Sequence, residues 1–87
     1  MRHATPETIE ALGDVITALR GIDGITETRP GAFSRRSRAF LHFHDDPTGY
    51  YADVRFGADF ERFRVTTRRE QQALLSRVRR ELARERK

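Results

Sequence analysis

Two histidines and an aspartate in the stretch FLHFHDDPTGYYADVRF, residues 40–56, carry side chains that could do chemistry. His42 and His44 are one residue apart, and Asp53 follows after a turn. Imidazole and carboxylate groups together can bind a transition metal, or can act as a general base and the group that orients it. Either chemistry requires the three side chains to meet on one face, so the elements that hold them must be identified.

The residues around the histidines alternate in the way that a β-strand requires. Between Ser37 and His44, one side of the alternation holds Ala39, Leu41 and Phe43, and the other side holds Phe40, His42 and His44. A period of two residues predicts a strand with one buried and one open face. The stretch DPTG at 46–49 predicts a hairpin turn, and the alternation resumes in two further strands that end near Val65.

The turn lengths predict which residues face each other. A four-residue loop, Asp46–Gly49, pairs residue 42 with residue 53, and a tight second hairpin at Ala58–Asp59 pairs residue 53 with residue 64. The predicted outer face therefore carries a row His42–Asp53–Arg64. The other residues predicted on this outer face are Phe40, His44, Tyr51, Arg55 and Arg62. Opposed side chains are close enough to interact, so we expect Asp53 to stay ionised.

Apolar residues at helical spacing predict one helix near each end of the chain. Thr5 is a candidate N-cap before Pro6, and the helix that follows ends at Gly21. Thr67 and Glu70 form a T-x-x-E capping box at the start of the second helix. Both helices have one apolar stripe, which must be buried against the sheet.

The segment between the first helix and the histidine strand is rich in turn residues. Pro30 and Gly31 indicate a loop with one short strand around Ile25–Thr28, and SRRS at 34–37 indicates a basic turn. The chain is therefore predicted to be a single α+β domain over residues 1–87. We predict an antiparallel sheet of three to four strands, with N- and C-terminal helices packed on one face in the order α-β-β-β-β-α.

Composition restricts the class of protein. With 87 residues, of which 37% are hydrophobic, the chain can build one small core but no large enclosed active site. It has no cysteine, and therefore no disulfide and no thiolate metal ligand. The first 15 residues lack the apolar run of a signal peptide, and no segment is long and apolar enough to span a membrane. We therefore expect a cytoplasmic protein without a membrane partner.

The positive charge is concentrated in the second part of the chain. Residues 35–87 carry fourteen Arg or Lys against eight acids, whereas residues 1–34 carry three against five. This asymmetry favours a polyanion, and aromatic and Arg side chains together on the outer face are typical of nucleic-acid binding. A basic face of the second helix adds Arg69, Arg77, Arg80 and Arg84. All but one of the 17 basic residues are Arg. A GC-rich genome, which favours Arg codons over Lys codons, is therefore an alternative explanation for the many arginines.

Three other functions compete with nucleic-acid binding. A metal site would need Asp53 or Tyr51 as a third ligand beside the two histidines, and Arg64 would compete for the Asp53 carboxylate. An enzyme is disfavoured because the His–Asp pair has no evident nucleophile and an open sheet face excludes water badly, and we predict no cofactor. An exposed Phe40 and Tyr51 patch would suit a protein partner or a homodimer.

On the stretches RPGAF, FLHFH and GYYADVRF, the chain resembles the small bacterial MmcQ/YjbR-type proteins, and its order of elements is similar to the CyaY-like fold. A second resemblance is to the bacterial luciferase-like domain family, in which a G-x-x-F stretch, an H-x-H strand and an acidic strand follow one another. The matching residues here are Gly31, Phe33, His42, His44 and Asp53. The first resemblance implies a DNA-binding role and brings no catalytic residues.

These features together predict a small non-enzymatic binding module, with nucleic acid bound at a basic and aromatic sheet face as the leading hypothesis. A protein-interaction or homodimer-forming module is the alternative. A metal or acid–base site at His42, His44 and Asp53 has less support.

Overall fold

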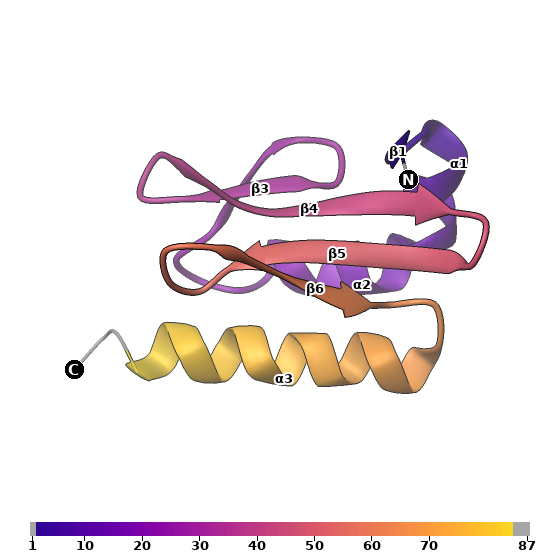
Figure 1. Cartoon of the computed structure of the whole chain (residues 1–87). Helices are drawn as coiled ribbons and strands as arrows, with labels where there is room; N and C mark the ends of the chain where they lie inside the picture. The colour runs from indigo at the N-terminus through magenta and orange to yellow at the C-terminus, as the bar shows by residue number, and fades with distance from the viewer. Residues whose placement is uncertain (1, 85–87) are drawn as a thin grey trace.

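The computed structural model describes residues 2–84, in which helices pack on an antiparallel sheet (Figure 1). In chain order the elements are β1 (Arg2–His3), α1 (Pro6–Ala11), α2 (Gly13–Arg20), β2 (Thr26–Arg29), β3 (Ala32–Arg35), β4 (Arg38–Asp46), β5 (Gly49–Arg55), β6 (Phe60–Arg64) and α3 (Arg68–Arg84). The strand order is β2-β3-β4-β5-β6, and β1 pairs with β4. The predicted α+β class is confirmed, with more strands than the three to four predicted. Met1 and residues 85–87 of the predicted domain lie outside the described residues.

The additional strand β3 comes from a segment that the sequence indicated as loop and turn. Gly31 has a φ of +77°, a left-handed conformation that favours glycine, and it lets the chain reverse between β2 and β3. A Cβ at this position would lie 2.4 Å from Ile9 Cδ1, so the turn packs directly on α1. Arg36 and Ser37 have φ values of 53° and 65°, which suit the two-residue turn that joins β3 to β4. Turn geometry, rather than hydrophobic alternation, therefore specifies this strand.

Both predicted helix starts are confirmed. Thr5 Oγ1 accepts a hydrogen bond from the Thr8 N–H at 3.3 Å. At the start of α3, the Glu70 N–H donates to Thr67 Oγ1 at 3.1 Å and the Thr67 N–H donates to Glu70 Oε1 at 2.9 Å. The N-terminal helix is interrupted at Leu12, immediately before a glycine with low helix propensity, so two helices replace the one predicted.

Within residues 2–84, no helix combines the length and the apolar character that a membrane crossing requires.

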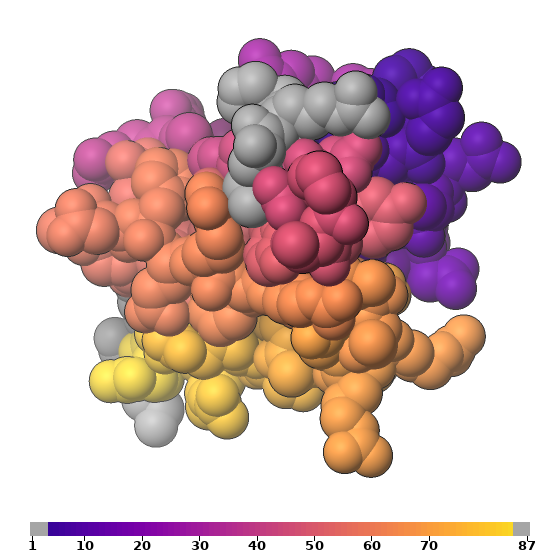
Figure 2. All heavy atoms as spheres, turned by 45° about the vertical axis from the view of Figure 1, so that its right-hand side comes forward, coloured from indigo at the N-terminus to yellow at the C-terminus, as the bar shows by residue number. Residues whose placement is uncertain are grey.

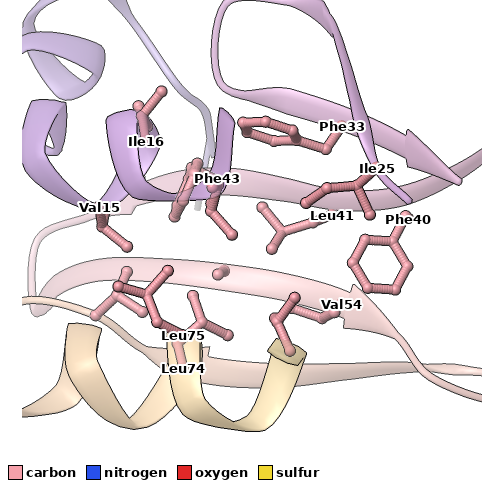
Figure 3. Packing of buried hydrophobic residues seen from close by; sticks show 14 of the residues in the cluster. Val15, Ile16, Ile25, Phe33, Phe40, Leu41, Phe43, Val54, Leu74 and Leu75 are labelled. Carbon is pink, nitrogen blue, oxygen red and sulfur yellow. The ribbon is translucent and has the colours of Figure 1, made fainter. Parts of the chain in front are cut away.

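One hydrophobic core joins the helices to a single face of the sheet (Figure 3). Its fully buried members include Val15, Ile16, Leu19, Leu41, Phe43, Val54, Leu74 and Val78. Residues of α2, of α3 and of the central strands thus share one cluster, as the apolar stripes predicted. The alternate residues of β4 and β5, including His42 and Asp53, point to the opposite face.

Phe40 belongs to this core and not to the outer face, so its predicted position was wrong. The pairing of β3 with β4 runs from Phe33 opposite Leu41 to Ser34 opposite Ala39, which leaves Phe40 as an extra residue in a β-bulge. The bulge breaks the alternation and turns the ring inward, where only 2% of the residue is exposed.

We expect Phe40→Ala to lower the free energy of unfolding by about 3–5 kcal/mol, because it removes a buried ring and leaves a cavity. Phe60→Ala is the matched control, since Phe60 is 40% exposed; we expect it to cost about 1 kcal/mol or less. Urea unfolding of both variants measures the difference. Equal losses would contradict the inward placement of Phe40.

Candidate functional site

The outer face is built on the pairing of β4 with β5, which has the predicted register. His42 lies opposite Asp53, and His44 lies opposite Tyr51. The next hairpin differs from the prediction, because β6 is shifted by two residues and places Arg62, not Arg64, opposite Asp53. The shift arises because the hairpin closes at Arg55 and Phe60 around four residues instead of two. A two-residue shift keeps every side chain on its own face, so alternation cannot distinguish the two registers.

Asp53 is the centre of a polar cluster on this face. Arg62 donates two hydrogen bonds to its carboxylate, from Nε to Oδ1 at 2.8 Å and from Nη2 to Oδ2 at 3.0 Å. Asp53 Oδ2 also lies 2.9 Å from His44 Nε2 and 3.6 Å from His42 Nε2. The Asp53 side chain is only 12% exposed, whereas that of Arg62 is 53% exposed. One carboxylate therefore connects β4, β5 and β6.

Hydrogen bonds from Arg62 hold the pKa of Asp53 below its usual value, with further contributions from the charges of His44, Arg62 and His42. Partial burial acts in the opposite direction and is outweighed. Asp53 is therefore ionised at neutral pH, as predicted, and its charge is compensated within the cluster.

The two imidazoles and the ring of Phe60 pack against one another. The His42 ring is edge-on to the His44 ring at 4.6 Å between centroids and edge-on to Phe60 at 5.2 Å. The Arg55 guanidinium lies 4.9 Å from the centre of the Phe60 ring. Phe60 thus supplies the outer-face aromatic ring that the sequence assigned to Phe40. Phe60 lies two residues before Arg62, so strand alternation places both side chains on the same face. This signal could have identified Phe60.

Arg64 serves the junction between the sheet and α3 instead of the Asp53 cluster. It donates to Glu70 Oε1 at 2.9 Å and to the carbonyl of Thr48 at 3.2 Å. The β4–β5 turn, which comes forward in Figure 2, therefore lies against the residues that lead into α3. Tyr51 Oη is 2.6 Å from Thr48 Oγ1 in the same turn. Both side chains lie on the predicted face, but neither contacts Asp53 in the way that Arg62 does.

The predicted basic face of α3 is divided by the structure. Arg69, Arg80 and Arg84 are exposed. Arg77 is half-buried, because its guanidinium lies 4.6 Å from the centre of the Phe56 ring and its Nε donates to Glu81 at 3.2 Å. Arg77 therefore joins helix to sheet and contributes less to an exposed basic surface than predicted.

A second basic surface, which the sequence indicated only as a turn, lies where the β3–β4 hairpin meets the end of β5. A hollow of about 150 Å³ is lined there by Arg35, Arg36, Arg38 and Arg55, together with Phe40 and Phe56. We call these six residues the basic hairpin end. The described lining contains four arginines and no acidic residue.

No family model, curated protein or solved structure matches the chain. The geometry of its own residues is therefore what bears on function.

We expect Asp53→Asn to destabilise the fold by about 1–2 kcal/mol at neutral pH, because Arg62 loses a charged acceptor. A carboxyl whose folded pKa is lowered stabilises the fold above its unfolded pKa, about 3.9, and this contribution is lost as the pH falls through the lower folded pKa. Urea unfolding between pH 5 and pH 2 should therefore show the wild type converging on the variant. Asp59→Asn, at an exposed position, is the control; an equal loss in both variants would contradict the role of the cluster.

Proposed function

We propose that the protein binds nucleic acid through the phosphate backbone, with the basic hairpin end as the contact surface. The observation that carries this proposal is the placement of four arginines around one hollow of about 150 Å³. A guanidinium group presents donors in a planar fork that matches phosphate oxygens, and several such groups around one hollow can contact one phosphate. Arg36 and Arg38 are exposed, which gives a ligand direct access to them.

The arrangement of the elements supports a broader basic surface at this end of the molecule. The β3–β4 turn, the β5–β6 turn and the C-terminal end of α3 all lie toward the same end (Figure 1). The exposed Arg80 and Arg84 belong to that part of α3. A strand of nucleic acid carries a phosphate at every nucleotide, so a row of arginines suits it better than it suits a single small anion.

The contacts on the sheet face leave few groups there for a nucleic acid, which favours the basic hairpin end as the contact surface. Phe40 is in the core, and Arg62 and Arg64 are bound to the carboxylates of Asp53 and Glu70. Stacking of bases requires exposed aromatic rings, and the exposed ring of Phe60 on this face is already packed edge-on against His42 and beside the Arg55 guanidinium. We therefore expect binding that depends little on nucleotide sequence.

The alternative of a protein-interaction or homodimer-forming module depended on an exposed patch of Phe40 and Tyr51. With Phe40 buried, that patch is reduced to the half-exposed ring of Tyr51 beside Thr48, and the exposed ring of Phe60 on the same face packs against His42 and Arg55. We therefore place this alternative second.

The double variant Arg36→Gln/Arg38→Gln tests the proposal. We expect it to weaken binding to duplex DNA or single-stranded RNA about tenfold at low salt, and to reduce the slope of log K against log salt by about 1–2, because up to two phosphate contacts are lost. Fluorescence anisotropy with labelled oligonucleotides of both kinds measures both quantities.

The matched control is Arg68→Gln/Arg69→Gln, which removes the same charge from exposed residues at the other end of α3. It should leave most of the affinity in place. An equal loss in the control, or no wild-type binding to either oligonucleotide at low salt, would overturn the proposal.

A further inference from the structure

The imidazoles of His42 and His44 and the carboxylate of Asp53 present donor atoms that all lie within 4.8 Å of one another. Asp53 Oδ2 is 2.9 Å from His44 Nε2 and 3.6 Å from His42 Nε2. Two donors bonded to one tetrahedral zinc ion are about 3.4 Å apart, given bond lengths of about 2.0–2.1 Å. Only small side-chain rotations would bring the three atoms onto one ion. We propose that His42, His44 and Asp53 form a binding site for a divalent transition metal ion.

The backbone positions these three ligands before any ion arrives. His42 and Asp53 are directly opposed on β4 and β5, two strands with a partner on each side. His44 lies two residues further along the same face, and its ring contacts that of His42. Ligands on paired strands are held more accurately than ligands on loops, so little conformational entropy is lost when the ion binds.

The donor set indicates the class of ion. Two imidazoles and one carboxylate suit Zn²⁺, Co²⁺, Ni²⁺ or Fe²⁺, and they are a poor set for Ca²⁺ or Mg²⁺, which prefer oxygen ligands throughout. Three protein ligands leave at least one coordination position for water or a small ligand, as in catalytic rather than structural zinc sites. His42 also lines a hollow of about 440 Å³ together with Phe60, so this hollow adjoins one of the three proposed ligands.

Arg62 affects such a site in two ways. Its Nε bond to Oδ1 can persist while Oδ2 binds the ion, so Arg62 would keep the carboxylate oriented as outer-shell partners of metal ligands do. Its positive charge also opposes a second cation nearby. We therefore expect an affinity weaker than that of a site without an adjacent guanidinium.

The test uses the full chain after treatment with a chelator. Titration with Co²⁺, followed by visible absorption, and with Zn²⁺, followed by calorimetry, should show one ion per chain. His42→Gln and His44→Gln should each weaken Zn²⁺ binding about tenfold or more. Zn²⁺ should also raise the unfolding temperature of the wild type more than that of His44→Gln, because only an ion bound to the folded state stabilises it.

Two controls make the assignment specific. Arg36→Gln/Arg38→Gln should bind Zn²⁺ like the wild type, so the metal site and the nucleic-acid surface are tested independently. His3→Gln removes the remaining histidine, whose backbone pairs with that of His44, and should leave the affinity unchanged. Far-UV circular dichroism checks folding; if His44→Gln fails to fold, the half-exposed His42 still provides the test. Absence of binding by the folded wild type, or binding insensitive to His42→Gln, would overturn the proposal.

Discussion

The charge of Asp53 is the constraint on which the sheet depends. A carboxylate with so little exposure must be paired, or the fold bears the cost of removing it from water. Asp53 meets this requirement with residues of both neighbouring strands, Arg62 on β6 and the two histidines on β4. A two-residue slip of β6 would leave apolar residues inside and would exchange Arg62 for Arg64 opposite Asp53, so Asp53 finds an arginine in either register. What distinguishes the observed register is the position of Arg64, which donates to Glu70 and to the carbonyl of Thr48.

The position of Arg64 shows how this choice extends to the helix. With Arg62 bound to Asp53, Arg64 reaches both Glu70 and the backbone of Thr48. Glu70 in turn accepts the N–H groups of Thr66 and Thr67 at the start of α3. The register of one hairpin is therefore coupled to the cap of the last helix through two neighbouring arginines on the same face of β6.

The sequence predicted those parts of the fold whose signals are local. The DPTG turn and the alternation around it were sufficient for the pairing of His42 with Asp53, and the T-x-x-E pattern was sufficient for the start of α3. It failed where two strand registers place the same residues on the same face, as for the registers that set Arg62 or Arg64 opposite Asp53. It also failed at Phe40, where the bulge places two consecutive residues, Phe40 and Leu41, in the core. The two adjacent apolar residues could be seen in the sequence. Which of them departs from the alternating pattern is determined only by the pairing with β3.

The bulge at Phe40 separates two parts of β4 that would otherwise share one register. On its far side the strand belongs to the arginine-rich turn, and on its near side it carries the histidines opposite β5. A bulge can take up a change in the number of residues locally, and the pairing of Ala32 with His42 lies beyond it. Lengthening, shortening or recharging the loop at Arg36 and Ser37 would then leave the imidazole positions intact, so the two surfaces of this small protein are free to diverge separately in evolution.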